Sequence, residues 1–542
     1  MGALRILGLL ALAVLASCGG GAEAPQPLGS KPIPLDALAA VAAASPDASP
    51  RLRGFHVAGE YYFANQAQLG NPTDAWLDYL QRTGVDWVGV SISMFSANLA
   101  EPSVYVQMRV PGEPPQFYRT FSDEQLTGFT RALHSRGIKV YWTLAFDQPQ
   151  FDAGLGDPSF NPNPRNCGTA LYNVPRYQFG DPDAPAHNRC IPASEWFWSP
   201  THPQHAQKTA RFFQSMTQVA ARYGRLAQSL GVEMYSLGTE TEWLWRTRSA
   251  VGSHFRVQLQ AMVDSVREVY TGLLTYDQHL DAAKYRFGHD QYIPVFSDLG
   301  LDVVGVSYYS NEVPAEPNSV VSVETLKAGF LSDFDKYLTT MKAANGDRPV
   351  VLTEFGFVNS VNAAWNQSAN LGEPAMGDSN GNGIFDGDEQ MSNLLTAFAA
   401  AVDQRRGLLA GGFLWGQPVF LPSPEISQRI DFPVYGRAPE TAVRQAYTAW
   451  AASQPAFPAP SNRSYECFFD WAETSFPTFF PPPGNPGAVG PLIYRQYSAA
   501  GAYLGAAPKE LQLFYVGPLS SGELLRLGPV GDWLTRAGCP AR

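Results

Sequence analysis

The sequence predicts an α/β chain: a (β/α)8 TIM barrel followed by a small, disulfide-linked α+β module. Three observations support this prediction. Short apolar runs alternate with amphipathic stretches along most of the chain. The glycine-rich phosphate loop of a doubly wound open sheet is missing from the sequence. The 542 residues, 45% of them hydrophobic, suffice for one barrel of about 250 residues or more plus a smaller module.

The N-terminal segment has the pattern of an export signal. Arg5 precedes an apolar run over residues 6–16 that is too short to span a bilayer. The run ends in Leu15-Ala16-Ser17-Cys18, which resembles a bacterial lipobox, in which the cysteine becomes the lipidated first residue. The alternative is an ordinary signal peptide cleaved nearby. We expect an exported protein, lipid-anchored through Cys18 on the periplasmic or cell-surface side of a bacterial membrane.

The chain divides by composition into five parts. Residues 1–18 are the expected signal, and 19–50 are a flexible linker rich in Ala and Pro. The barrel domain is predicted over 51–452. A Pro/Ala/Ser linker over 453–461 leads to a C-terminal module of unknown function, residues 462–542. Within that module two apolar runs flank Ala499-Ala500-Gly501, which predicts a hairpin of Ile493–Tyr497 with Tyr503–Leu504.

The barrel elements follow from periodicity. The expected strands are 55–58, 87–92, 139–144, 233–237, 273–276, 303–307, 350–353 and 412–415. The expected helices are 74–83, 123–135, 204–230, 255–270, 323–344 and 391–405. Ser122 and Gln125 have the spacing of a capping box before the second helix. Long connections over 95–118, 146–199 and 356–389 follow strands, so we expect them at the C-terminal face of the barrel, where active sites form.

Four cysteines remain once Cys18 is set aside: Cys167, Cys190, Cys467 and Cys539. An even count in an exported chain indicates two disulfides, and four cysteines allow three connectivities. We expect Cys167–Cys190 and Cys467–Cys539, because each pair lies within one predicted domain. Metal binding by thiolates is the weaker interpretation, since the sequence has no CxxC spacing.

Charge and motifs exclude several function classes. The formal net charge of −11 argues against nucleic acid as a partner. The sequence has no HExxH and no GxSxG, which disfavours metal-assisted and serine hydrolysis. Aromatic residues make up 13% of the chain and charged residues only 16%, which fits a packed enzyme or a sugar binder. We expect no organic cofactor and a monomer that binds a polysaccharide or oligosaccharide substrate.

Two glutamates end predicted strands of the barrel. The fourth strand leads into Glu240 and the seventh into Glu354. Cleavage of a glycosidic bond needs one carboxyl group to protonate the leaving oxygen and a second to attack or stabilise the anomeric carbon. In a barrel, only side chains at the C-terminal strand ends face the pocket, so this pair is a candidate for that chemistry.

The motifs around these glutamates resemble those of β-mannanase family 113 in clan A of the glycoside hydrolases. The matching segments, in order, are Leu237-Gly238-Thr239-Glu240, Gly272-Leu273-Leu274-Thr275-Tyr276, Leu301–Tyr309, Thr353-Glu354-Phe355-Gly356-Phe357 and Gly412-Phe413-Leu414-Trp415. The resemblance implies Glu240 as acid/base and Glu354 as nucleophile of a retaining, endo-acting β-1,4-mannanase. Retention predicts carboxyl groups about 5–5.5 Å apart.

Six further residues are expected to contact substrate: Trp415, Tyr308, Tyr276, Trp142, Trp243 and Glu242. For each aromatic residue among them packing in the core is the alternative, and function is favoured only for Trp415 and Tyr308. The resemblance implies that Trp415 stacks on the sugar, and Tyr308 is placed to hydrogen-bond Glu354. Glu242 is the rival for the acid role and would more naturally contact a sugar hydroxyl. The polar run after the fifth strand, Tyr276-Asp277-Gln278-His279, departs from the family pattern.

A twelve-residue stretch from Asp378 to Glu389 fits the EF-hand calcium pattern. The expected ligands are Asp378, Asn380, Asn382, Asp386, Glu389 and the backbone carbonyl of Ile384. The alternative is a solvated turn of Asp, Asn and Gly residues. We expect a structural Ca²⁺ that pins the loop after Glu354.

Two other functions compete with the mannanase hypothesis. One is a non-catalytic, glycan-binding surface lipoprotein built on a TIM barrel. The other is a retaining glycosidase for a different β-linkage, such as a glucan or a galactoside.

Overall fold

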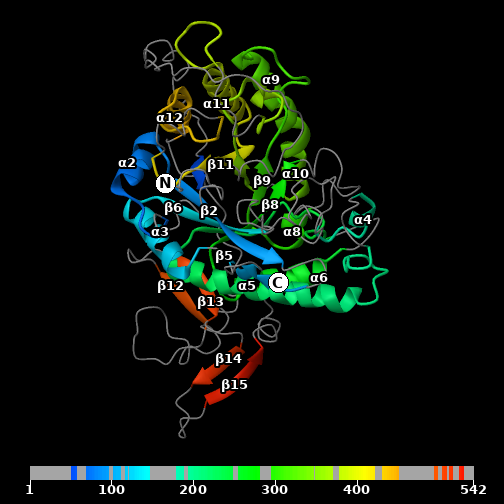
Figure 1. The fold of residues 1–542 in the computed structure, drawn as a ribbon. Coiled ribbons are helices and arrows are strands. Elements are labelled where there is room, and N and C mark those ends of the chain that lie inside the picture. Colours follow the sequence, from blue (N-terminus) through cyan, green and yellow to red (C-terminus); the bar gives the residue numbers. More distant parts are fainter. Residues whose placement is uncertain are drawn as a thin grey trace.

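The computed structural model describes most of the predicted barrel and four short strands of the C-terminal module (Figure 1). The signal segment with Cys18 and the four remaining cysteines lie outside the described residues, so their predicted lipidation and pairing stay predictions. The described residues are 51–57, 69–96, 102–110, 116–119, 121–146, 179–187, 193–247, 254–280, 294–346, 348–369, 377–421, 430–450, 493–497, 503–508, 512–516 and 524–529.

A closed barrel of parallel strands forms the centre of the structure. Each strand pairs in parallel with the next, and the pairing of β1 with both β2 and β11 closes the ring. This arrangement is the (β/α)8 barrel that the alternation of strand and helix patterns predicts. Its strands are β1 Leu52–Val57, β2 Trp87–Ser96, β6 Lys139–Phe146, β7 Met234–Thr239, β8 Leu273–His279, β9 Val304–Tyr308, β10 Val350–Phe355 and β11 Leu409–Gln417.

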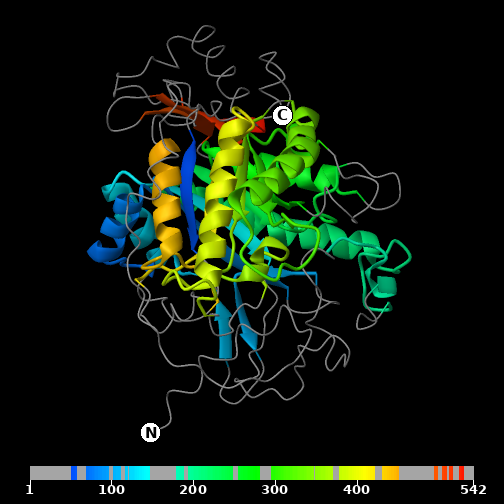
Figure 2. The same cartoon turned by 90° about the horizontal axis from the view of Figure 1, so that it is seen from above.

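Helices surround the strands, and α11 packs beside α12 on one flank (Figures 1 and 2). The longer ones are α2 Asp74–Thr83, α3 Asp123–Ser135, α5 His205–Leu230, α6 Arg256–Arg267, α9 Val323–Asp333, α10 Thr339–Ala344, α11 Asp386–Gln404 and α12 Ala438–Trp450. Short turns are α4 Ala184–His187, α8 Val295–Asp298, a π-helical turn η7 Phe334–Leu338 and a 3-10 turn η8 Val361–Ala364. None of the described helices is long and apolar enough to cross a membrane.

The predicted helix boundaries are confirmed where the sequence carries caps. The capping box of Ser122 and Gln125 is present at the start of α3, and Gly84 ends α2 in the left-handed conformation. The helix predicted from residue 391 instead begins at Asp386, because acidic residues suit a first helical turn. The region 323–344 is helical, but η7 interrupts the α-helical pattern. Helix α12 was not among the predicted elements.

Antiparallel pairs lie outside the barrel ring. Strand β3 (Val104–Tyr105) pairs with β2, and β4 (Gln107–Val110) pairs with β5 (Gln116–Arg119). In the C-terminal module β12 (Ile493–Tyr497) pairs with β13 (Tyr503–Pro508), which confirms the predicted hairpin. Strands β14 (Gln512–Val516) and β15 (Leu524–Pro529) form a second pair.

One apolar layer fills the N-terminal end of the barrel interior. Every barrel strand, or the residue just before it, contributes one buried side chain to this layer, so the barrel is a packed core rather than a pore. The members are Leu52, Trp87, Tyr141, Met234, Leu273, Val303, Val351 and Phe413. With this end filled, the opposite, C-terminal end is the place where polar side chains can meet substrate.

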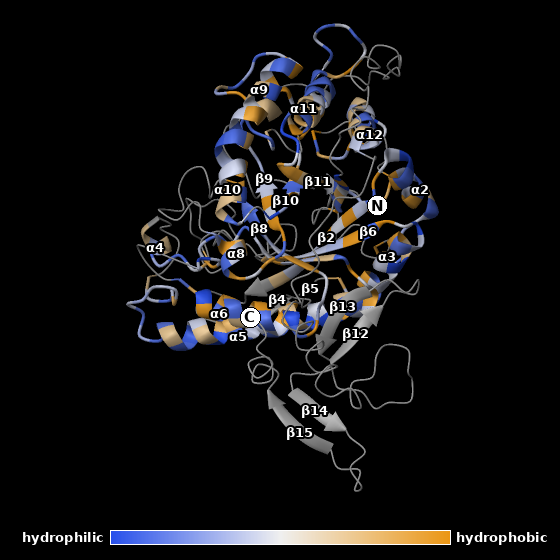
Figure 3. Ribbon diagram, turned by 180° about the vertical axis from the view of Figure 1, so that it is seen from behind, coloured by the Kyte–Doolittle hydropathy of each residue, from blue (hydrophilic) through white to orange (hydrophobic). Residues whose placement is uncertain are grey.

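A second and larger apolar cluster lies between the strands and the helices. Apolar residues concentrate on the strands and on the inward faces of the helices, whereas the outer helix faces are polar (Figure 3). Burial of one such large side chain contributes about 1.5–3 kcal/mol to folding.

A buried ion pair joins α6 to the segment just before β9. Arg267 contacts Asp302, and both side chains are almost fully buried. Asp302 also accepts a hydrogen bond from the Leu274 N–H (2.8 Å), and Arg267 donates to the Gly272 carbonyl (2.8 Å). The pair therefore fixes the start of the strand that carries the polar run Tyr276–His279.

Replacing Arg267 by Met should lower the free energy of unfolding by about 3–5 kcal/mol, because the carboxylate of Asp302 stays buried without its partner. Urea unfolding followed by circular dichroism measures the loss. The exposed pair Arg405–Asp335 supplies the control, since Arg405→Gln should change stability far less. Equal losses in the two variants would contradict this account of the buried pair.

Candidate active site

The two predicted catalytic glutamates lie at the C-terminal end of the barrel. Glu240 directly follows β7, and its side chain is 21% exposed. Glu354 is the second-to-last residue of β10 and is 5% exposed. Both therefore occupy the strand ends that the sequence predicts for them.

Strand register places three polar side chains in one row across the mouth. His279 of β8 is in register with Ser307 of β9, and Ser307 is in register with Glu354 of β10. Glu240 reaches this row from β7: its Oε1 accepts a hydrogen bond from the Ser307 hydroxyl at 2.6 Å and lies 3.7 Å from His279 Nε2. Ser307, which Glu240 contacts, lies beside Glu354 on the neighbouring strand, and neighbouring strands are about 4.8 Å apart.

The backbone at Glu240 is held in an unusual conformation. Its φ of 50° is the one positive value found at a non-glycine among the described residues. The Glu240 N–H donates to the Asp277 carbonyl (2.8 Å), and the Thr241 N–H donates to the Tyr276 hydroxyl (2.8 Å). These two bonds to β8 hold the turn, and positive φ at such a residue is common at functional sites.

Glu242 lies two residues further along the same turn and is buried. Its Oε1 accepts a hydrogen bond from the His279 N–H (2.8 Å), whereas its Oε2 has no hydrogen-bond partner within the described part of the chain. Burial raises the pKa of Glu242 to about 7, with a smaller contribution from Glu240, while His279 lowers it. Glu242 can therefore change charge near neutral pH.

A polar layer supports the site from below. Asp277 is fully buried, and its carboxylate accepts a hydrogen bond from the Thr353 hydroxyl, which precedes Glu354. This contact joins β8 to β10 across β9. Gly305 of β9 makes room for it, because a Cβ there would lie 2.7 Å from Thr275 Oγ1 and 3.1 Å from Thr353 Cγ2.

Two of the predicted aromatic platforms are partly exposed. Trp415, at the end of β11, contacts the His56 ring edge-on with ring centroids 4.6 Å apart. Trp243 lies in the turn after Glu240, and the Arg246 guanidinium lies 3.5 Å over its ring. Both remain candidates for stacking on a sugar, because part of each side chain is open.

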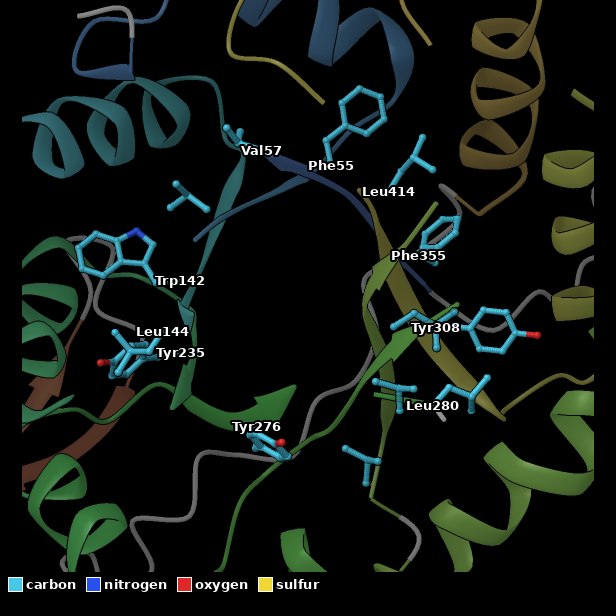
Figure 4. Packing of buried hydrophobic residues seen from close by; sticks show 14 of the residues in the cluster. Phe55, Val57, Trp142, Leu144, Tyr235, Tyr276, Leu280, Tyr308, Phe355 and Leu414 are labelled. Carbon is cyan, nitrogen blue, oxygen red and sulfur yellow. The ribbon is translucent and has the colours of Figure 1, made fainter. Parts of the chain in front are cut away.

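Three other predicted substrate contacts are wrong. Trp142, Tyr276 and Tyr308 are completely or almost completely buried in the core between strands and helices, and Figure 4 shows Trp142 and Tyr308 pointing away from the barrel interior. Tyr308 packs against Phe330 and Phe334, and its hydroxyl has no hydrogen-bond partner among the described residues, so it does not bond Glu354. Tyr276 stacks on Trp245 with centroids 4.4 Å apart and supports the Glu240 turn.

Comparison with known families shows what kind of protein the chain resembles. Residues 192–437 match the model of Glycoside Hydrolase Family 113, and this stretch includes both Glu240 and Glu354. The chain is a glycoside hydrolase that resembles family 113. No curated protein sequence matches it.

Several solved structures are also similar to this hydrolase. A GH113 β-1,4-mannanase solved as a complex is 15% identical with a TM-score of 0.46, covering 74% of this chain and 99% of that one. A GH113 β-mannanase from Alicyclobacillus acidocaldarius is 17% identical with a TM-score of 0.43, covering 75% and 100%. A family 5 mannosidase from Rhizomucor miehei is 11% identical with a TM-score of 0.40, covering 75% and 94%.

Sequence reasoning missed three residues of the candidate site: His279, Ser307 and His56. The polar run Tyr276–His279 was the available signal for His279. Ser307 lies within a matching motif, but its contact with Glu240 depends on strand register, which the sequence does not show. His56 lies on β1 without any motif around it.

His56 connects β10 to Trp415. Its Nδ1 lies 3.2 Å from the Thr353 carbonyl and therefore carries the proton, so Nε2 accepts from the Ser91 hydroxyl (3.1 Å). Burial lowers the pKa of His56 to about 4. The neutral ring thus supports Trp415 from one side and the residue before Glu354 from the other.

The predicted calcium loop is ordered by its own side chains. Asp378 accepts hydrogen bonds from the N–H groups of Gly381, Asn382 and Gly383, which holds its pKa below the usual range. The side-chain amides of Asn380 and Asn382 both donate to Glu389 Oε2. Within the described residues, no three His, Cys, Asp or Glu side chains are grouped closely enough to hold a metal ion.

Replacing His56 by Gln should reduce the acid sensitivity of folding. In the unfolded chain this imidazole becomes protonated below about pH 6.5. In the folded chain it stays neutral down to about pH 4. His56 therefore lowers the free energy of unfolding as the pH falls between these two values. The wild type should lose on the order of 2–3 kcal/mol more than the variant between pH 7 and 4.5. Urea midpoints at each pH measure the difference, and parallel curves would contradict the assignment.

Proposed function

We propose that this hydrolase is a retaining, endo-acting β-glycanase, with β-1,4-mannan as its polymer. One observation carries the proposal. Glu240 accepts a hydrogen bond from Ser307, and Ser307 is in register with Glu354 on the neighbouring strand. The family match supports a glycosidase, and the resemblance of the motifs to β-mannanases gives the choice of mannan.

The two carboxyl groups have distinct surroundings that suit distinct roles. Glu354 is 5% exposed, and the residue before it, Thr353, is hydrogen-bonded to Asp277. Glu354 is therefore rigidly placed for attack on an anomeric carbon. Glu240 is more open and accepts a hydroxyl hydrogen bond from Ser307 on one oxygen. We assign Glu354 as the nucleophile and Glu240 as the acid that protonates the leaving oxygen and then the base that activates water.

The remaining contacts follow from this assignment. Trp415 and Trp243 provide the partly open aromatic faces on which sugar rings stack. The export signal and the Cys18 lipid anchor, predicted from the sequence, would place the enzyme where polymers outside the cell can reach it.

A reducing-sugar assay on β-mannan, β-glucan and β-galactan panels tests the function. The wild type should release sugars from β-1,4-mannan, Glu354→Gln should abolish release, and Glu240→Gln should lower it by about 10²–10⁴-fold. Glu324→Gln, an exposed change of the same charge on α9, is the matched control and should keep full activity.

Other outcomes would replace the mannanase proposal. Activity confined to β-glucan or β-galactan would move the substrate to another β-linkage. Binding of a polymer without hydrolysis would favour the glycan-binding lipoprotein. Proton NMR of the first product should show the β-anomer, and an α-anomer would refute retention.

We also propose that residues 378–389 bind one Ca²⁺ that orders the loop after Glu354, as their EF-hand spacing predicts. Calorimetric titration of the chelator-stripped chain should show one site, which Glu389→Gln should remove. Absence of any calcium heat in the wild type would refute the site, and the residues would then be a solvated turn.

A further inference from the structure

The end of β8 contacts the turn carrying the acid/base at three successive residues. The Asp277 carbonyl accepts from the Glu240 N–H, the Tyr276 hydroxyl accepts from the Thr241 N–H, and Glu242 accepts from the His279 N–H. Two of these bonds fix backbone conformation. The third involves a buried carboxyl group whose second oxygen has no partner among the described residues.

The His279 side chain is directed at the acid/base. Its Nε2 lies 3.7 Å from Glu240 Oε1, the same oxygen that accepts the Ser307 hydroxyl. The imidazole is stacked near Tyr309 with ring planes 19° apart, and 23% of the side chain is exposed. Its orientation is thus fixed by β8 on the main-chain side and by an aromatic ring on the other.

We propose that Glu242 and His279 form a coupled pair that sets the proton affinity of Glu240, with Glu242 positioning His279 through its backbone N–H. The proposal rests on the assignment of Glu240 as acid/base. In this proposal His279 and Glu242 are positioning residues: they act on the proton of Glu240 and take no direct part in the reaction of Glu240 and Glu354.

The electrostatic consequence has opposite signs for the two residues. A protonated His279 favours the carboxylate form of Glu240, whereas an ionised Glu242 favours its protonated form. Among the described residues, the titratable groups closest to Glu240 along these contacts are Glu242 on its own turn and His279 on β8, with Asp277 two residues before His279 and Glu354 beside Ser307. Burial raises the pKa of the Tyr276 phenol well above its usual value, so that group stays neutral.

The coupling suits a residue that must release a proton and then recover one. In the first half-reaction Glu240 gives its proton to the leaving oxygen, and in the second it takes one from water. The carboxyl group of Glu242 has a pKa of about 7 and interacts with both His279 and Glu240, so its charge can follow these changes at Glu240.

Titration of the His279 ring tests the coupling without any assay of activity. We would follow the ring by NMR in the full chain labelled with ¹⁵N-histidine, using His279→Gln to assign its signal among eight histidines. Glu240→Gln and Glu242→Gln should each lower the pKa of His279, because each removes a carboxyl group that stabilises the imidazolium when it is ionised. Glutamine keeps the shape of glutamate and, at residue 242, an acceptor for the His279 N–H.

Glu324→Gln is the control and should leave the His279 titration unchanged. A shift with Glu240→Gln but none with Glu242→Gln would overturn the coupled pair, as would unchanged titration in both variants. These results decide the coupling even if no polymer is hydrolysed, so the failure of this inference differs from failure of the proposed function.

The pH profile of kcat/KM gives the second readout. The alkaline limb should move to lower pH in Glu242→Gln and to higher pH in His279→Gln, by about half to one unit in each case. A purely structural role would lower activity at every pH without moving the limb, and that result would overturn the proposal.

Discussion

The parallel register of β8, β9 and β10 is the constraint on which the candidate site depends. It places His279, Ser307 and Glu354 in one row, and it gives Glu240 a partner in that row. Because register is shared along each strand pair, a slip of one residue would turn Ser307 outward and bring Tyr308 inward. The buried contacts below the row, from the Arg267–Asp302 pair to Asp277 and Thr353, hold this register.

Along the barrel axis, the side chains that pack the core and the polar side chains of the candidate site occupy different ends. One apolar layer fills the N-terminal end, a buried polar layer lies above it, and the carboxyl groups occupy the mouth. Turn strain is concentrated at Glu240, where two bonds to β8 hold a positive φ. The rigid scaffold thereby fixes the positions of titratable groups in a partly buried site.

The sequence predicted the barrel and the two glutamates because strand ends and motifs are local features. It failed for Trp142, Tyr276 and Tyr308, since a strong motif does not say which face of a strand a side chain occupies. Alternation offered one correction: if Glu354 and Ser307 face inward, Tyr308 next to Ser307 must face outward. The contacts of His279 and His56 could not be predicted, because they depend on pairing between strands distant in sequence.

Trapping of the glycosyl-enzyme tests the central claim most directly. A fluorinated glycoside that forms the covalent intermediate quickly and releases it slowly would mark the nucleophile, and peptide mass spectrometry would locate the label. Our account predicts one adduct, on the peptide that contains Glu354, and none in Glu354→Gln. An adduct on Glu242 or Glu240, or substrate turnover with inversion and no adduct, would contradict it.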